Sequence, residues 1–321
     1  MSKDRYTFKE ISNKKVWDEY FSNALKSNLS QDWGYGEFRE KTGNWKVKRY
    51  SIVAKDQVVG IFQCYEKSMP VIDIFKIVYI NRGPLLLSEF NNEQYSNLIK
   101  ALRQYFSIFR GKALILSPFR EISAELEFVM KKQRFISKFT NSYTTSYLDL
   151  TKSEELLRKE LNAKWRNQLN TAEKKELRFV TDETGAYDEF VLKAYRQMSS
   201  EKEFDTLSNQ QLSTLFGIYR KQGGMYVYLV LNSENEPLAF KIFIGYGKSV
   251  VYFIGWVSTE GRPTNAPKFL IWNAVKELKS IGYIDFDLGG LDPVNLPGIS
   301  KFKQGMGGRD AVFTERWISI I

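Results

Sequence analysis

Hydrophobic residues in the first half of the chain follow two different periods. Short apolar runs bounded by turn residues predict strands, and the first two of them flank a polar turn at 55–57. Between 92 and 109 the apolar residues instead recur every three or four positions, which predicts a helix with Asn91 or Asn92 as its N-cap. The expected strands lie at 50–54, 58–63, 75–80 and 113–117, and the expected helices at 92–109 and 122–132.

The second half repeats this order of patterns. It begins with a helical pattern and continues through a three-stranded meander to another helix and a final strand. The expected helices lie at 153–175, 187–199, 208–222 and 267–280, and the expected strands at 178–180, 226–231, 238–244, 249–256 and 283–288.

Both halves therefore predict a meander, then a helix, then a strand. This order indicates a mixed α/β (α+β) protein made of two similar units, each with a central mixed sheet flanked by helices. The expected domains are residues 1–150 and 151–321, and the last strand can return to the first domain. A length of 321 residues also exceeds what one hydrophobic core usually serves.

Charge and residue usage narrow the possible chemistry. The formal net charge of +10 is compatible with an anionic partner such as nucleic acid, phosphate or anionic lipid, although the basic residues are scattered. The chain has no histidine, which excludes Ser-His-Asp and Cys-His catalysis and the usual zinc sites. Cys64 is the single cysteine and fits a packed strand residue. No metal site is expected.

Location can be predicted only from the absence of targeting patterns. The N-terminal residues are charged and lack the apolar segment of a signal peptide. No window approaches the roughly 20 apolar residues that a membrane span needs. We therefore expect a cytoplasmic protein that can work at the inner face of the membrane through peripheral contact.

Two glycine clusters near the end of the chain bracket one lysine. The first is 285–290 and the second is 302–308, which contains Lys303. Glycine lets backbone N–H groups approach a ligand closely, and lysine adds a compact positive charge. This pattern predicts a site for a negative or developing negative charge; the alternative is a glycine-rich turn with a solvated lysine.

Six segments, in order from residue 31 to 308, resemble the FemABX-like aminoacyltransferases, which build peptidoglycan interpeptide bridges. They are the segments at 31–45, 79–84, 164–174, 267–272, 286–290 and 298–308. The resemblance implies tandem GNAT-like domains, the acyl-CoA N-acyltransferase fold. It also implies transfer of an aminoacyl or acyl group to an amine, with aminoacyl-tRNA as donor. The long coiled-coil arm of some members is absent from the pattern.

The resemblance also implies which residues bind substrate. Lys303 matches the family lysine that contacts the tRNA end and the reacting ester, and it is the expected catalytic residue. Arg39 and Lys202 lie where members carry a basic residue for the phosphates of the acceptor. The other expected substrate-binding residues are Arg82, Asp287, Phe302, Gly305, Gly307 and Gly308.

Such chemistry does not need histidine. Aminolysis of an activated ester requires two aligned substrates and a stabilised oxyanion, which a lysine and backbone N–H groups can supply. Asp287 and Tyr252 are candidates for proton removal, and both also fit structural roles. Arg82 either clamps a phosphate or pairs with a carboxylate.

Departures from the family pattern leave the acceptor and the donor open. The residues after Gly83-Pro84 are Leu85–Ser88, where cross-bridge enzymes often carry acidic residues, and 209–211 lack the expected tyrosines. The acceptor is therefore an amine on a peptidoglycan-type precursor or on another nucleotide- or lipid-linked amino sugar.

An acyl-CoA donor is the first alternative to this function, although 261–267 lacks the glycine spacing of a pyrophosphate loop. A non-catalytic module that binds tRNA or a glycolipid is the second. No tightly bound cofactor and no obligate protein partner are expected.

Overall fold

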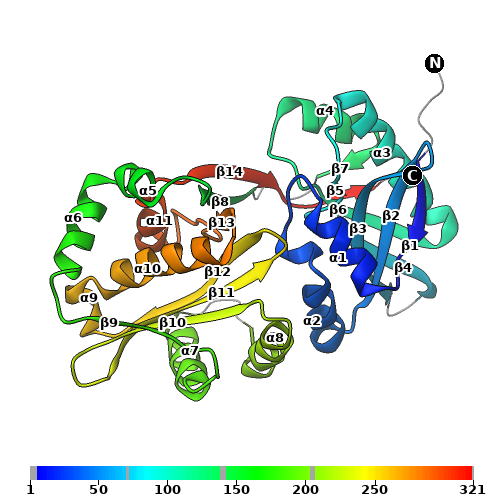
Figure 1. The fold of residues 1–321 in the computed structure, drawn as a ribbon. Coiled ribbons are helices and arrows are strands. Elements are labelled where there is room, and N and C mark those ends of the chain that lie inside the picture. The colour runs from blue at the N-terminus through cyan, green and yellow to red at the C-terminus, as the bar shows by residue number, and fades with distance from the viewer. Residues whose placement is uncertain (1–5, 70–71, 138–141, 203–206, 320–321) are drawn as a thin grey trace. The chain divides into compact units, whose positions relative to one another are not determined.

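The computed structural model describes residues 6–69, 72–137, 142–202 and 207–319. The chain divides into two compact units, here called unit 1 (Met1–Tyr143 with Val312–Ile321) and unit 2 (Thr144–Ala311). Each unit is built on one mixed β-sheet with helices packed on it (Figure 1). The predicted fold class, two mixed sheets flanked by helices, is confirmed.

The unit 1 sheet is centred on an antiparallel meander. Strands β2, β3 and β4 pair in sequence order, and β4 then pairs in parallel with β6. The strand order is β1-β2-β3-β4-β6-β15-β7, with β5 paired to β3. The strand bounds are β1 Thr7–Glu10, β2 Lys46–Ala54, β3 Gln57–Met69, β4 Ile72–Asn81, β5 Leu85–Leu86, β6 Lys112–Ser117, β7 Phe135–Ile136 and β15 Trp317–Ser319.

Helices cover the unit 1 sheet because their apolar faces match its buried positions. Helix α3 begins with a capping box formed by Asn91 and Gln94 and buries Leu98, Ile99 and Leu102 against the strands. Cys64 lies in the same core, and burial raises the pKa of its thiol. The helices are α1 Lys14–Ser22, α2 Trp33–Gly43, α3 Asn92–Tyr105 and α4 Ala124–Lys132, with short 3-10 turns η1 Leu29–Gln31 and η2 Ile108–Arg110.

The unit 2 sheet has the order β14-β8-β13-β12-β11-β10-β9. Strands β10, β11 and β12 form the predicted antiparallel meander, and β13 pairs with β12 in parallel. The strand bounds are β8 Ser142–Asp149, β9 Arg178–Thr181, β10 Met225–Leu231, β11 Pro237–Tyr246, β12 Ser249–Val257, β13 Asp285–Asp287 and β14 Arg309–Thr314.

Both faces of the unit 2 sheet are covered, which explains the continuous apolar runs in its central strands. Along β10, Tyr228 and Val230 pack into the core under α10, whereas Val227 and Leu229 pack into the core with α7 and α8. Figure 1 shows these helices on opposite faces of the sheet. The helices are α5 Glu154–Glu160, α6 Ala163–Ala172, α7 Asp188–Lys202, α8 Asn209–Lys221, α9 Gly261–Thr264, α10 Ala266–Ile281 and α11 Pro297–Gln304.

One sequence-based expectation for unit 2 was wrong in detail. The helix expected at 153–175 is two helices, α5 and α6, because the backbone of Leu161 leaves the helical conformation (ψ 138°) and Asn162 caps α6 through its side chain. The segment that holds Lys303 is a helix, α11, which the sequence patterns did not predict.

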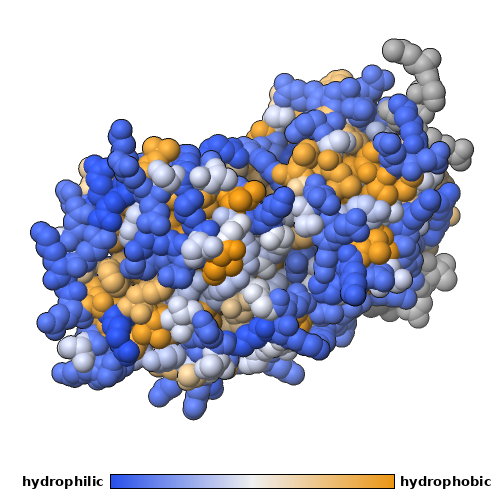
Figure 2. All heavy atoms as spheres, in the orientation of Figure 1, coloured by the Kyte–Doolittle hydropathy of each residue, from blue (hydrophilic) through white to orange (hydrophobic). Residues whose placement is uncertain are grey.

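The visible surface is mostly hydrophilic, with smaller apolar patches between charged side chains (Figure 2). Isolated exposed apolar residues such as Phe109 and Val294 are normal for a folded domain. Among the described residues, no helix combines the length and apolar composition needed to cross a bilayer.

Candidate functional site

Helix α11 holds Lys303 inside unit 2. The helix begins at Pro297, which suits a first turn because its missing N–H would have no partner there. The Lys303 side chain is buried, with 7 % of the residue exposed, and its Nζ donates to the carbonyl oxygen of Gly290 at 2.9 Å. Gly290 itself is exposed. The ammonium group therefore lies just below the surface, held by one backbone carbonyl.

Burial changes the protonation of Lys303. Removal from water lowers the pKa of its amine from 10.5 to about 8, and the nearby Asp287 carboxylate partly opposes this shift. Asp287 is itself buried and accepts hydrogen bonds from Thr145 Oγ1 and from the N–H of Gly289 at 2.8 Å. Asp287 therefore fixes the turn after β13, and Lys303 remains without a carboxylate within ion-pairing distance among the described residues.

Two further lysines lie around the ring of Phe302, the residue before Lys303. Nζ of Lys241, on β11, is 4.8 Å from the ring centroid, and Nζ of Lys268, on α10, is 5.5 Å from it. Lys241 also donates to the hydroxyl of Tyr252, on β12, at 2.7 Å. Lys241, Lys268 and Lys303, with Phe302 and Tyr252, are called the lysine cluster below.

The lysine cluster concentrates positive charge that no described carboxylate pairs with at salt-bridge distance. Burial lowers the pKa of Lys241 well below its usual value, and the charges of Lys303 and Lys268 lower it further. Burial, followed by the charge of Lys164, lowers the pKa of Lys268. Buried ammonium groups that pair with no carboxylate favour either a bound anion or a neutral amine.

A glycine on β12 makes room for this arrangement. Gly255 pairs with Lys241 across the two strands, and the Tyr252 hydroxyl lies over it. A Cβ at Gly255 would lie 1.9 Å from that hydroxyl oxygen, so only glycine fits without displacing the ring. A register shift between Ile242 and Phe243 opposite β12 places a bulge at the same point, a common device for re-aiming side chains near sites. Burial raises the pKa of Tyr252, which therefore stays a phenol.

The glycines after Lys303 pack closely against their own unit. The N–H of Gly305 donates to Lys301 and that of Gly307 donates to Gln304. A Cβ on Gly305, Gly307 or Gly308 would come within 2.4 to 2.6 Å of an atom of α6, α5 or β8 respectively. Close packing accounts for these three glycines, and their role in substrate binding stays a prediction.

The predicted arginines lie in unit 1. Arg39, on α2, places its guanidinium 5.5 Å from the ring centroid of Trp45 and 5.6 Å from that of Tyr65. Arg82 follows β4 with a φ of 50°, and its Nη1 donates to the carbonyl of Thr314 at 2.7 Å. This bond gives Arg82 a backbone partner within unit 1. Lys202 is the last residue of α7, and its side chain lies outside the described residues.

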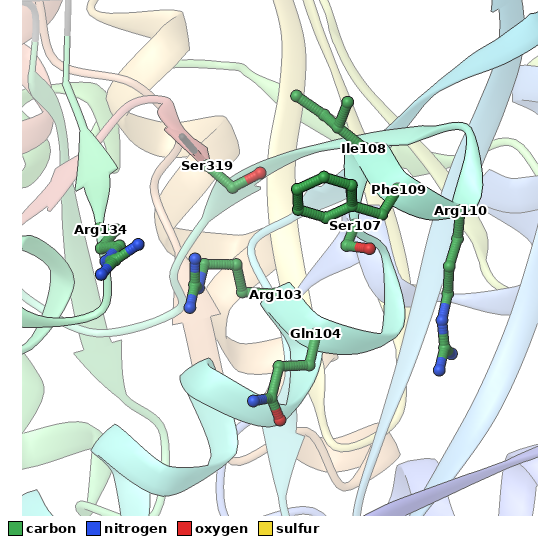
Figure 3. A pocket seen from close by; sticks show the side chains of 8 residues that line it. All are labelled: Arg103, Gln104, Ser107, Ile108, Phe109, Arg110, Arg134 and Ser319. Atoms are coloured by element: carbon green, nitrogen blue, oxygen red, sulfur yellow. The ribbon is translucent and has the colours of Figure 1, made fainter. Parts of the chain in front are cut away.

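Unit 1 also carries a hollow bordered by three arginines. Arg103, Arg110 and Arg134 line it with Gln104, Ser107, Ile108, Phe109 and Ser319. Figure 3 shows the guanidinium groups of Arg103 and Arg134 on one side, while Arg110 extends away from them. None of the residues predicted from the sequence to form the site lines this hollow.

Sequence reasoning missed Lys241 and Lys268. Lys241 is the only charged residue in the apolar run 238–244, and this isolated charge was a usable signal. It lies on the same face of β11 as Ala239 and Phe243, both of which pack under α10. The structure thus brings Lys303, Phe302 and Asp287 together with two lysines that the motif did not include.

No family model matches this chain, and no curated protein matches it. Solved structures do match it. A crystal structure of FemX superposes with a TM-score of 0.82 over 98 % of this chain and 97 % of that one, at 15 % identity. A tandem GNAT protein from the clavulanic acid biosynthesis pathway gives 0.55 over 98 % of each chain, at 9 % identity.

A third match is L-PGS from Bacillus licheniformis, with a TM-score of 0.53 over 96 % of this chain and 91 % of that one, at 14 % identity. Because all of these identities are low, the likeness establishes the fold. The chain has the tandem GNAT fold of FemX, as its sequence motifs predicted.

Proposed function

We propose that this protein transfers an aminoacyl group from aminoacyl-tRNA to an amine on a cell-wall or cell-surface glycan precursor. The observation that carries this proposal is the buried Lys303 ammonium, held by one backbone carbonyl and unpaired with any described carboxylate. The tandem GNAT fold shared with FemX supports the same class of reaction.

The geometry suits stabilisation of a negative charge that develops during acyl transfer. An amine that attacks the ester carbonyl of the donor produces an oxyanion, and a preorganised cation in a water-poor site stabilises it strongly. With a pKa of about 8, Lys303 is largely protonated at neutral pH. The ring of Tyr252, whose centroid lies 5.2 Å from Lys303 Nζ, limits access of water.

The local structure favours a tRNA ester over acyl-CoA as the donor. In acyl-CoA enzymes of this fold a pyrophosphate would bind free N–H groups at the start of a helix such as α10. Here Ala266 donates to Thr264 Oγ1, Lys268 donates to Asn265, and Pro267 has no N–H. The helix start therefore lacks the free amides that a diphosphate needs.

The donor can be tested directly. Purified protein would be incubated with radiolabelled aminoacyl-tRNA or with radiolabelled acetyl-CoA, together with a mixture of nucleotide-linked and lipid-linked amino-sugar precursors. We expect label from aminoacyl-tRNA to appear in an amide product. Label from acetyl-CoA alone would support the acyl-CoA alternative instead. Binding of tRNA or glycolipid without any turnover would favour the non-catalytic module.

The acceptor is the less specified substrate. Its proposed class is a nucleotide- or lipid-linked glycan with a free amine, bound by basic residues such as Arg39, Arg82 and Lys202. A lipid-linked acceptor would require contact with the inner face of the membrane. Mass spectrometry of the amide product from the same incubation would identify both the acceptor and the amino acid.

A further inference from the structure

The hydrogen bond between buried Lys241 and Tyr252 has not yet been assigned a role in the transfer reaction. Lys241 is 4 % exposed, and its Nζ lies 2.7 Å from the Tyr252 hydroxyl and 4.1 Å from the centroid of that ring. Tyr252 is partly exposed. The hydrogen bond therefore joins a buried amine to a side chain that is partly exposed.

The surroundings of Lys241 disfavour its charged form. The charged or titratable groups that face Lys241 are Lys303 from α11, Lys268 from α10 and Tyr252 from β12. Asp287 lies beside Lys303 and does not pair with Lys241. Burial and two neighbouring cations shift the protonation equilibrium of Lys241 toward its neutral amine. A neutral Lys241 can accept a hydrogen bond from the Tyr252 phenol across the same 2.7 Å.

We propose that Tyr252 and Lys241 form a proton relay that deprotonates the attacking amine of the acceptor. This inference rests on the proposed transfer reaction and names the base for it. In this proposal the Tyr252 hydroxyl contacts the acceptor and is the catalytic group, and Lys241 acts through it. Asp287 is less suited to this step, since Thr145 and the Gly289 N–H both already bond to its Oδ1.

The relay conserves protons and charge. The acceptor arrives as an ammonium and gives one proton to the Tyr252 oxygen, while Tyr252 passes its own hydroxyl proton to Lys241 Nζ. The resulting neutral amine attacks the ester carbonyl, so that a C–N bond forms and the ester C–O bond breaks. One of the two protons on the attacking nitrogen ends on the leaving oxygen. The proton held by Lys241 is released to water before the next cycle.

The relay can be tested with nucleophiles that differ in their need for a base. Wild-type protein, Tyr252→Phe and Lys241→Gln would be supplied with radiolabelled aminoacyl-tRNA and either the same mixture of nucleotide-linked and lipid-linked amino-sugar precursors or hydroxylamine. Hydroxylamine is mostly unprotonated at neutral pH and does not need the relay. We expect each variant to lose about 100-fold in kcat with the amine acceptor. With hydroxylamine the loss should be only a few-fold.

Matched controls separate this role from a structural one. Lys248→Gln removes an exposed lysine in the turn between β11 and β12, and Tyr226→Phe removes a hydroxyl that bonds to Tyr283 elsewhere in the unit. Both should retain wild-type rates with both nucleophiles. The pH dependence of kcat gives an independent readout, because in Tyr252→Phe its acidic limb should move to the higher pH at which the acceptor ammonium loses its proton to water.

The possible outcomes are distinct. Equal losses with the amine and with hydroxylamine, or an unchanged acidic limb, would overturn the relay. A raised KM for aminoacyl-tRNA at unchanged kcat in Lys241→Gln would also overturn it, because that result assigns the lysine to binding of a donor phosphate. If wild-type protein aminolyses no charged tRNA with any nucleophile, the transfer function itself fails, and the relay fails with it.

Discussion

The two units differ in the partners of their buried lysines and carboxylates. In unit 1, buried Glu66 pairs with Lys112 at 3.0 Å. In unit 2, the hydrogen bonds of buried Lys241 and Lys303 among the described residues go to a phenol and to a backbone carbonyl.

This difference separates a structural use of buried polarity from a functional one. Buried charges normally persist because a partner offsets the loss of water. Glu66 and Lys112 in unit 1 follow that rule. Lys241 and Lys303 in unit 2 are amines whose folded surroundings lower their pKa values, and such groups concentrate at functional sites. The two units therefore share an architecture but differ in the partners of their buried lysines, and the difference lies where the transfer reaction is expected.

The largest effect should follow loss of the Lys303 ammonium. We expect Lys303→Ala to reduce transfer by about 100- to 1,000-fold, the scale for losing one preorganised oxyanion stabiliser, while the protein stays folded. Lys301→Ala, two residues earlier on the exposed side of α11, is the matched control and should keep full activity. Initial rates and thermal melts of both variants would decide this, and a fully active Lys303→Ala would remove Lys303 from the site.

Breaking the unit 1 ion pair should affect stability instead of transfer. Glu66→Ala leaves Lys112 without its partner and opens a small cavity, so we expect the free energy of unfolding to fall by about 3 kcal/mol. Urea denaturation measures this change. Transfer per folded molecule should be unaffected, and a change below 0.5 kcal/mol, about the level of an ordinary surface substitution, would show that the pair is not structural.

The free energy of unfolding should change with pH in the alkaline range because Lys303 titrates differently in the folded and unfolded states. Its pKa is about 8 in the folded protein and 10.5 when solvated, so between these values the unfolded state binds more protons. Stability therefore rises with pH across this window, by about 2 kcal/mol for this one group, allowing for its incomplete burial. Denaturation of wild type and Lys303→Met at pH 7.5 and 10 tests the sign. Equal pH slopes in the two proteins would contradict it.

The smallest effect has the opposite sign from that of Glu66→Ala. Lys241→Met keeps the length of the side chain and removes a buried amine that pairs with no described carboxylate, so we expect the free energy of unfolding to rise by about 1 kcal/mol. The same variant should lose transfer to amines. A destabilised Lys241→Met would mean that the Tyr252 hydrogen bond serves the fold and would erase the contrast between the units.

Local pattern was enough to predict most of the architecture. The helix expected at 267–280 is α10, Ala266–Ile281, because its apolar stripe and early proline are both local signals. Helix α11 was missed because Pro297, Gly298 and Gly305 lie at or near its ends in a segment of only eight helical residues. The break between α5 and α6 at Asn162 was missed because the sequence on both sides of it has the pattern of a charged, amphipathic helix.

The site could be predicted only in part, since its geometry depends on long-range pairing. The motif around Lys303 is contiguous in sequence and was visible as such. The surroundings of Lys241 depend on the strand register, which sets it opposite Gly255, and on a bulge in the neighbouring strand. In a sheet covered on both faces, most positions are apolar, so alternation of apolar and polar residues does not show toward which face a side chain points. A lysine in such a strand therefore gives no local indication of what it faces.

The position of the last strand has a consequence for biosynthesis. Strand β15 lies between β6 and β7 in the unit 1 sheet, although it is the final element of the chain. As the protein emerges from the ribosome, the unit that is made first cannot complete its sheet until residue 319 has appeared. Unit 1 is therefore complete only after all of unit 2, whose residues run continuously from 144 to 311, has been synthesised. This departs from the usual order of cotranslational folding, in which the amino-terminal domain folds before the next is made.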